Sequence, residues 1–570
     1  ASGSRPTPAG LRETGATSAV VWALRRQRST GRPPSWRVGM GLAASLLVAA
    51  SPLRPLRAAE QLQVQLDGMV IPLQIHELVA WGRSGGVSNS ELGIWLNLLE
   101  PDSREGVLEL LRAPLINDRS MARQLLGSWA GRRLLDEVAD IVRVDDDSAG
   151  DTLLNTLESL LNRQEQVSSL DLLEALPASH VRLDLDALLQ AAGHWRQQLQ
   201  RQQQLVRRLA SEARDQAPAA STLAGSRAAS LAALGVREPE TQLLPVNHRA
   251  QPLRLQLWRP QPGAPAHSTW LVWMPGLGGS PDHFRWLGRA LSQRGWSVLV
   301  LEHPGSDAEA VKALLDGRRP PPGAEVIPDR LRDLEAVLAA RRSGTIALSG
   351  EQLVLGGHSL GALTALLGAG ARPRSGLDRR CATALDDLPL SNLSRLLQCQ
   401  LAEVALPPSA ENTPPADLVG LIGMNSFGSL LWPRNRPLQL PVPVLFSGGS
   451  LDLITPPQSE QLGLMLALAP HPASRAVVVD GASHFSPVRV EGQAGEGQGE
   501  DLFRLGKELV GVQPLQVQTL LEDEIVVFLE LLEGSRPEAA AAQTSTLHRR
   551  IGDLQLHRLN RDAAARLLAD

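Results

Sequence analysis

Residues 353–369, LVLGGHSLGALTALLGA, change character in the middle. The first part is a short apolar run typical of a buried strand, and the last part has the apolar spacing of a helix. Between them Ser359 stands in a Gly-x-Ser-x-Gly motif with Gly357 and Gly361. Small residues on both sides permit a sharp strand-to-helix turn that exposes the hydroxyl, and the helix N-terminus favours developing negative charge. The stretch therefore predicts a nucleophilic serine on an α/β sheet.

A second stretch, WGRSGG at residues 81–86, also reads Gly-x-Ser-x-Gly. The motif arises easily by chance in a chain with 50 glycines among 570 residues, so its context must decide. Ser84 follows an expected helix, and the pattern indicates neither a strand before it nor a long helix directly after it. We therefore expect a turn at Ser84 and place the nucleophile at Ser359, for which a plain glycine turn is the alternative.

From residue 239 onward, strand-like and helix-like runs alternate. Helix-like runs separate the strand candidates from the third candidate onward, which predicts a mostly parallel sheet with helices on both faces. In such sheets active groups lie beyond the carboxyl ends of the strands. We expect an α/β domain over residues 239–533 with eight strands. The candidates are TQLLPV, PLRLQLW, TWLVWMP, WSVLVLE, EQLVLGG, LVGLIGM, PVPVLFSGG and SRAVVVD.

The residues expected to activate Ser359 follow the last two strand candidates. A serine needs a base to take its proton, and the base needs an acid to orient it. After a serine turn of this kind, the acid and then the histidine follow along the chain. His484 comes directly after RAVVVD, and Asp452 comes soon after PVPVLFSGG. Asp480 is the alternative acid, and a helix N-cap is the alternative role of Asp452.

Two backbone N–H groups are candidates for stabilising the oxyanion of a tetrahedral intermediate. The first belongs to Leu360, directly after the serine, and the second is expected in the loop after the third strand candidate. That loop is MPGLGGS, residues 274–280, in which Leu277 is the candidate donor. Gly276 and Gly278 would let the backbone approach a substrate. A phosphate-binding loop is the alternative, but the Gly-Lys-Ser/Thr ending is missing.

The expected surroundings of the serine are apolar. Phe427 and Trp432 follow the sixth strand candidate, and Phe485 follows the histidine. Each buried methylene contributes about 0.8 kcal/mol, so such surroundings favour an acyl chain over a peptide. We therefore predict that Phe427, Trp432 and Phe485 bind substrate together with Gly276 and Gly278.

An insertion at residues 371–415 follows the helix after the serine. It contains an apolar-periodic run, LSNLSRLLQCQLAEVAL, which predicts either a lid over the site or a packed surface helix. It also contains both cysteines of the chain, Cys381 and Cys399. In an oxidising compartment the two would pair, and the alternative is two buried free thiols.

The first 59 residues have the order of an export signal. Arginines come first, the short apolar core VGMGLAASLLVAA follows at residues 38–50, and small residues come next. This core is too short to span a bilayer comfortably. We expect export to a periplasm, a thylakoid lumen or the medium. An uncleaved anchor or a disordered tail is the alternative.

Three further segments complete the expected organisation. A mainly α-helical N-terminal domain is predicted at residues 60–210, and it opens on a hairpin in LQVQLDGMVIPLQI, which alternates around Asp67-Gly68. An Ala- and Ser-rich linker is predicted at residues 211–238. A helical tail is predicted at residues 534–570.

The composition excludes several classes of partner. The net charge of -4 gives no footprint for a polyanion, so nucleic acid is not an expected partner. Two cysteines without nearby histidines do not make a zinc site, and we expect neither a metal nor a cofactor. The hydrophobic content of 43% is ample for large cores.

Taken together, GGHSLG, MPGLGG, SGGSLDLITP and GASHF resemble the α/β-hydrolase superfamily on its lipase and esterase branch. The chain is similar to exported cyanobacterial hydrolases with an N-terminal helical domain of unknown function, and more distantly to secreted platelet-activating-factor acetylhydrolases. This resemblance implies that Ser359 is the nucleophile, Asp452 the acid and His484 the base. One departure is Pro275, which stands where many lipases have histidine.

These observations predict a serine hydrolase that cleaves carboxylic esters of small molecules or lipids through an acyl-enzyme intermediate. Two alternatives stay open: an amide or peptide hydrolase with the same three residues, and a non-catalytic α/β-hydrolase scaffold used for binding. Peripheral contact with a membrane, through the helical domain or the inserted segment, is a further open expectation.

Overall fold

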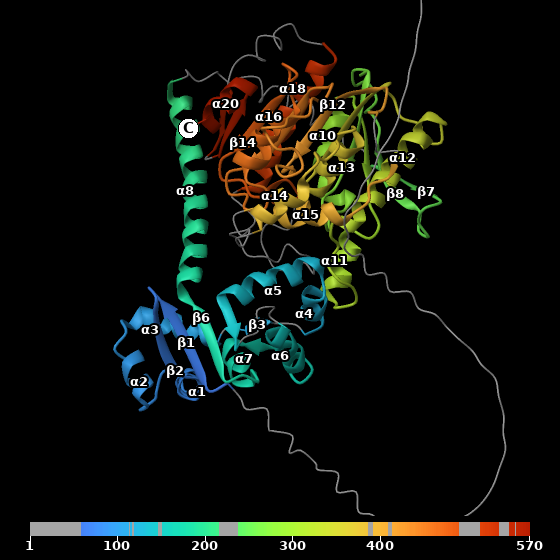
Figure 1. The fold of residues 1–570 in the computed structure, drawn as a ribbon. Coiled ribbons are helices and arrows are strands. Elements are labelled where there is room, and N and C mark those ends of the chain that lie inside the picture. Colours follow the sequence, from blue (N-terminus) through green and yellow to red (C-terminus); the bar gives the residue numbers. More distant parts are fainter. Residues whose placement is uncertain are drawn as a thin grey trace, which may run out of the picture. The chain divides into compact units, whose positions relative to one another are not determined.

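The computed structural model describes most of the chain after the predicted leader (Figure 1). The described residues are 59–112, 114–116, 119–145, 151–215, 238–385, 392–408, 413–488, 513–534, 547–552 and 554–569. The predicted leader at residues 1–59 lies outside them except for Ala59, and so does most of the predicted linker.

Ten of the described strands form one sheet, in the order β15-β16-β14-β13-β12-β11-β9-β10-β8-β7. The six central strands, from β14 to β10, run parallel to one another, and the two strands at each edge are antiparallel to their neighbours. The strands are β7 (Glu240–Leu244), β8 (Leu253–Trp258), β9 (Thr269–Met274), β10 (Ser297–Leu301), β11 (Gln352–His358), β12 (Leu418–Met424), β13 (Val444–Gly449), β14 (Arg475–Val479), β15 (Leu547–Ile551) and β16 (Leu554–Leu559).

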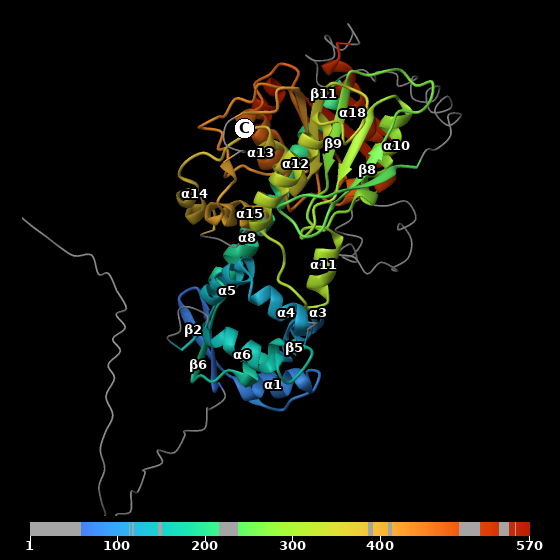
Figure 2. The same ribbon diagram turned by 90° about the vertical axis from the view of Figure 1, so that its right-hand side faces the viewer.

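Side chains of the central strands point alternately into two cores, which explains why these strands are apolar throughout. In β9, Trp270 and Val272 join one core, while Leu271 and Trp273 join the other. Figure 2 shows α12 and α13 on one side of β9 and α10 on the other. Helices α12 (Ile327–Arg342), α13 (Leu360–Gly368), α16 (Gly463–Leu468) and α20 (Arg561–Ala569) line the first core, and α10 (Arg285–Gln293) and α18 (Pro514–Leu532) line the second.

Apart from two helices of the inserted segment at residues 371–415, the remaining described elements of this part are short. They are α11 (Ala308–Leu315), the π-helix η5 (Pro457–Leu462), and the 3-10 turns η1 (Pro281–Phe284), η2 (Ala324–Val326), η3 (Leu401–Glu403) and η6 (Ser486–Val488). All eight predicted strands form, and the mostly parallel sheet with helices on both faces agrees with the predicted fold class.

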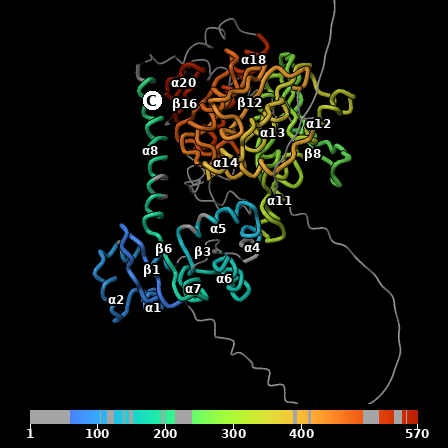
Figure 3. The backbone as a smooth tube through the Cα atoms, viewed as in Figure 1, coloured from blue at the N-terminus to red at the C-terminus, as the bar shows by residue number. Residues whose placement is uncertain are grey.

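The predicted helical tail at residues 534–570 is wrong over most of its described length. Strands β15 and β16 lie there, and β16 pairs with β14, so the sheet has ten strands and not eight. Figure 3 shows β16 beside the C-terminal helix α20. Alternation places Leu554 and Leu556 in the second core. Among the described residues of the tail, only those of α20, after the two strands, match the prediction.

The N-terminal part opens on the predicted hairpin. Strand β1 (Gln61–Leu66) pairs with β2 (Met69–Gln74), and Asp67 and Gly68 both have positive φ, of 50° and 74°. A two-residue turn with positive φ at both positions matches the twist of the paired strands.

Eight helices follow in the described residues, in agreement with a mainly helical domain. They are α1 (Ile75–Arg83), α2 (Glu91–Leu96), α3 (Pro101–Arg112), α4 (Arg119–Leu126), α5 (Trp129–Ile141), α6 (Asp151–Leu161), α7 (Ser169–Ala175) and α8 (Leu185–Asp215). Four short strands were not expected there. They are β3 (Pro114–Ile116), β4 (Val142–Val144), β5 (Val167–Ser168) and β6 (His180–Asp184), of which β6 pairs with β1 and β4.

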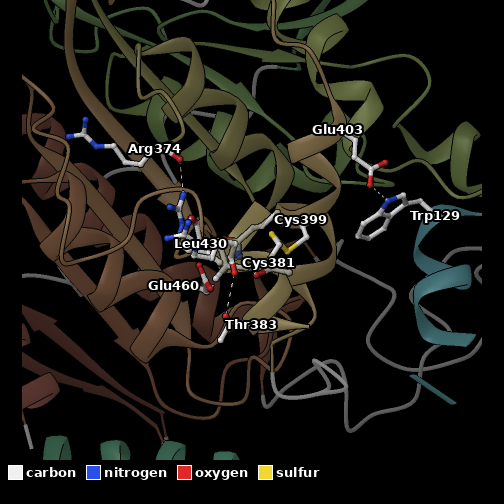
Figure 4. The surroundings of a disulfide bond; sticks show 12 residues. Trp129, Arg374, Cys381, Thr383, Cys399, Glu403, Leu430 and Glu460 are labelled. Atoms are coloured by element: carbon white, nitrogen blue, oxygen red, sulfur yellow. Dashed lines mark hydrogen bonds between the residues drawn. A yellow bond between two sulfur atoms is a disulfide. The ribbon is translucent and has the colours of Figure 1, made fainter. Parts of the chain in front are cut away.

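The inserted segment at residues 371–415 carries two helices joined by a disulfide. Cys381 of α14 (Leu377–Ala384) is bonded to Cys399 of α15 (Ser394–Gln400), with their Cα atoms 5.4 Å apart. Figure 4 shows this bond with Leu430 and Glu460 close by. Both cysteines are buried, so the disulfide packs within the first core. Residues 386–391 and 409–412 of the segment lie outside the described residues.

Within the described residues, every helix is too short or too polar to cross a membrane.

Candidate functional site

Ser359 occupies the turn from β11 into α13, as its flanking sequence predicts. Its backbone has φ 54° and ψ -118°, a conformation that residues other than glycine rarely adopt. The turn is tight because α13 approaches β9 closely: a Cβ atom at Gly361 would collide with the carbonyl of Met274. Ser359 is half-buried, so the residue is not enclosed in the core. A strained and half-buried serine of this kind is typical of a nucleophile.

The structure brings Ser359, His484 and Asp452 into one hydrogen-bonded chain. His484 Nε2 lies 3.0 Å from Ser359 Oγ, and His484 Nδ1 lies 2.9 Å from Asp452 Oδ2. The three residues follow β11, β14 and β13, whose carboxyl ends meet at one edge of the sheet. The predicted juxtaposition of these three residues is therefore present. Ser84, in contrast, ends α1 in a turn and donates its hydroxyl to the Trp81 carbonyl.

The Asp452 carboxylate is fully buried and stays ionised. Burial opposes ionisation, but His484 and hydrogen bonds from His484 and Thr455 outweigh it and hold the pKa of Asp452 at about 2. Because an ionised carboxylate can only accept, His484 Nδ1 must carry the proton that it donates to Asp452. His484 Nε2 is then the bare nitrogen, which accepts the Ser359 hydroxyl proton.

Asp452 also has the local role that its sequence suggests as an alternative. Its Oδ1 accepts the backbone N–H groups of Ile454 and Thr455, at 2.9 and 2.8 Å. This arrangement is a side-chain turn and not the cap of η5, which begins later, at Pro457. One oxygen therefore orders the loop while the other faces the histidine. The alternative acid, Asp480, accepts a hydrogen bond from Ser450.

Two residues that the sequence did not single out donate hydrogen bonds to the Asp452 carboxylate. Asn425 Nδ2 donates to Asp452 Oδ2 at 2.7 Å, and Thr455 Oγ1 donates to the same oxygen at 2.6 Å. Asn425 follows β12 directly and has a φ of 48°. A polar residue at the end of a central strand was the signal available for Asn425, whereas nothing in the pattern distinguished Thr455.

His358, next to the serine, contacts the backbone of His484. Its buried Nε2 lies 2.9 Å from the His484 carbonyl, which can only accept, so Nε2 carries a proton. Burial, together with the nearby His484, lowers the pKa of His358 to about 3. His358 is therefore neutral near pH 7 and positions the backbone of His484 without adding a charge.

The loop after β9 lies directly against the serine. A Cβ atom at Gly276 would be 3.1 Å from the Ser359 Cβ atom, which is tighter than ordinary van der Waals contact, so a larger residue would require its neighbours to shift. The Gly278 N–H donates to the Ser306 carbonyl at 2.8 Å, which anchors this end of the loop, and the close approach of substrate to Gly276 and Gly278 stays a prediction. Half-buried Leu277 stands between these two glycines. Leu360 is the first residue of α13, where an N–H has no acceptor within its own helix.

The predicted apolar surroundings are only partly present. Phe427 is 1% exposed and Trp432 is 0% exposed, and both belong to the first core. Trp432 Nε1 donates to the Arg372 carbonyl at 2.8 Å, which fixes the ring there. Both side chains therefore pack into the core, and their predicted contact with substrate stays a prediction. Phe485 is half-buried and lies edge-on to His484 with a ring distance of 5.3 Å.

Comparison with known proteins gives information on the class of protein but not on the reaction that it catalyses. Residues 58–184 match a family described as "Alpha/beta hydrolase of unknown function". A comparison with curated proteins finds no match. The matched residues lie in the N-terminal part, before the ten-stranded sheet. The match and the large mostly parallel sheet together support an α/β-hydrolase fold. In the described residues no group of three or more metal-ligating side chains is arranged to hold a metal ion.

The depressed pKa of Asp452 leads to a prediction about acid stability. Folding lowers this pKa from 3.8 to about 2, so the carboxylate stabilises the folded state above pH 3.8 and loses this contribution as the pH falls towards 2. Asp452→Asn should lower the free energy of unfolding near pH 7, and about 2 kcal/mol of the difference from wild type should disappear in that acid window. Urea unfolding from pH 7 to pH 2 measures it, and a difference that stays constant over the whole range would contradict the assignment.

Proposed function

We propose that the protein is a serine hydrolase that cleaves carboxylic esters of small molecules or lipids through an acyl-enzyme intermediate. The observation that carries this proposal is the hydrogen-bonded chain from Ser359 through His484 to Asp452. A serine hydroxyl becomes nucleophilic when a positioned base removes its proton, and the base needs a group that fixes its tautomer. Both conditions are met at the turn before α13.

In the proposed reaction, Ser359 Oγ attacks the ester carbonyl while His484 Nε2 takes the hydroxyl proton. Asp452 stabilises the resulting imidazolium without taking a proton itself. The oxyanion accepts hydrogen bonds from the Leu360 and Leu277 N–H groups. His484 then gives its proton to the alcohol oxygen as the ester C–O bond breaks, and the acyl group stays on Ser359 Oγ. A water molecule, whose proton His484 takes, attacks this acyl-enzyme. The acid leaves as Ser359 regains its proton from His484.

The two serine motifs provide a matched test. Ser359→Ala should abolish ester hydrolysis, because loss of a triad serine has been measured to cost on the order of 10^6 in kcat. Ser84→Ala removes the same hydroxyl from the second Gly-x-Ser-x-Gly motif and should leave kcat near wild type. Hydrolysis of a p-nitrophenyl ester by the two purified variants is the measurement. Loss of activity in Ser84→Ala alone would contradict the proposed nucleophile.

A second prediction concerns the acyl group. Half-buried Leu277 and Phe485 give the site apolar side chains, and each buried methylene contributes about 0.8 kcal/mol. We expect kcat/KM to rise from acetyl to medium-chain p-nitrophenyl esters and to be negligible for peptide amides. A chain-length series that peaks at acetate would contradict the lipase form of the proposal, and faster cleavage of amides than of esters would contradict the ester form.

A third prediction concerns export. We infer that the chain is exported, from the basic and apolar order of its first 59 residues and from the disulfide, since disulfides persist in oxidising compartments. The mature protein should begin near Ala58 to Glu60 and contain no free thiol. N-terminal sequencing and thiol titration of unfolded, unreduced native protein test both points. A protein that keeps its leader and has two reactive thiols would contradict the inference.

A further inference from the structure

Arg330, on α12, reaches three groups around the serine turn although it lies in the interior. Its side chain is 1% exposed. The guanidinium donates to the Pro275 carbonyl at 2.5 Å, to Ser306 Oγ at 2.8 Å and to Thr364 Oγ1 at 3.0 Å. Each of its three nitrogen atoms therefore has one acceptor on a different segment of the chain.

Two of these segments carry the proposed oxyanion donors. Pro275 immediately precedes Gly276, which lies against the serine, and Leu277 is the next residue. Thr364 lies one turn into α13 and donates its hydroxyl to the Leu360 carbonyl at 2.7 Å. Arg330 therefore holds both segments at once from the protein interior.

The third contact fixes the far end of the loop after β9. Ser306, which accepts from Arg330 through Oγ, also accepts the Gly278 N–H through its carbonyl at 2.8 Å. The loop is thus held at Pro275 by Arg330 directly and at Gly278 through Ser306. Leu277 lies between these two attachment points.

A buried carboxylate compensates the buried guanidinium. Asp333, one turn further along α12, is 0% exposed and accepts hydrogen bonds from His303 at 2.8 Å, from His248 at 2.7 Å and from both sides of the Arg249 guanidinium at 2.7 and 2.8 Å. Burial lowers the pKa of Arg330 to about 9, and Asp333 counteracts part of that shift. The guanidinium therefore stays charged near pH 7 and keeps all its donors.

We propose that Arg330 is a positioning residue that sets the oxyanion hole, because it fixes the Leu277 and Leu360 segments relative to each other. This inference rests on the proposed function. Lysine cannot replace the guanidinium, because a single ammonium lacks the planar fork that spans three acceptors. A misplacement of about 1 Å at such donors can cost about 100-fold in rate.

The test compares Arg330→Met with Arg558→Met. Arg558 is also buried and pairs with Glu524 at 2.6 and 2.7 Å, but it lies on β16, away from both donor segments. Arg330→Met should lower kcat for a p-nitrophenyl ester by about 100-fold with little change in KM, and weaken binding of an alkylboronic acid to a similar extent. Arg558→Met should lose stability but keep the kcat of the folded enzyme.

Hydrogen exchange provides a readout that does not need activity. In Arg330→Met, amides in residues 275–279 and 360–364 should exchange faster than in wild type, and in Arg558→Met they should not. If Arg330→Met does not fold, Arg330→Lys and Thr364→Val are the substitute variants. Both should lower kcat and speed exchange in the same two segments, with smaller changes than those expected for Arg330→Met.

Two results overturn the inference: equal kcat for the Arg330 and Arg558 variants, or unchanged exchange in both segments. A wild-type protein that hydrolyses no ester would contradict the proposed function instead. In that case the exchange data still decide whether Arg330 holds the two segments.

Discussion

The site depends on one unfavourable backbone conformation, the positive φ of Ser359. A non-glycine residue held in such a region costs about 1–3 kcal/mol, so the surrounding structure must enforce it. The N–H of Ser359 donates to the Met424 carbonyl of β12 at 2.8 Å, and α13 is buried along its length beside the sheet. Because β11 and α13 are both fixed in the core, the turn between them has no room to relax. The conformation aims the hydroxyl at His484.

The charges around this turn favour transfer of the Ser359 hydroxyl proton to His484. Asp452 is ionised and His358 is neutral, so the protein's own negative charge lies behind His484 and is separated from Ser359 by the imidazole. A positive charge that develops on His484 is therefore stabilised by Asp452, with Asn425 and Thr455 keeping that carboxylate in place. Arg330 hydrogen-bonds to the two segments that carry the proposed oxyanion donors, Leu277 and Leu360. Different residues therefore support proton transfer to His484 and stabilisation of the oxyanion in the proposed reaction.

Local patterns predicted the residues of the hydrogen-bonded chain, because each one directly follows a strand or lies in the loop after it. The strand before Ser359 and the helix after it were both readable, and so were the strands before Asp452 and His484. Supporting residues such as Asn425 and Arg330 were missed because their roles depend on which strands become neighbours, and the local pattern does not contain the strand order. The burial of Phe427 and Trp432 could not be predicted for a similar reason, since apolar residues after a strand can turn to the core or to the site.

The edges of the fold were harder to predict than its centre. Strand β16 begins with the alternation Leu-Gln-Leu, and Gly552 before it has a φ of 57°, so part of a hairpin signal was present, whereas β15 does not alternate. The Ala-rich sequence on both sides obscured it. The short strands β3 to β6 are two to five residues long, and runs of that length carry little periodicity of their own between helices.

The most direct measurement of the central claim is active-site labelling. The native protein is treated with a fluorophosphonate probe, and the modified residue is located by peptide mass spectrometry. If the strained turn makes Ser359 nucleophilic, the probe should modify Ser359 alone and labelling should disappear in His484→Ala. An unlabelled protein, or labelling of Ser84 or another serine in its place, would contradict the claim.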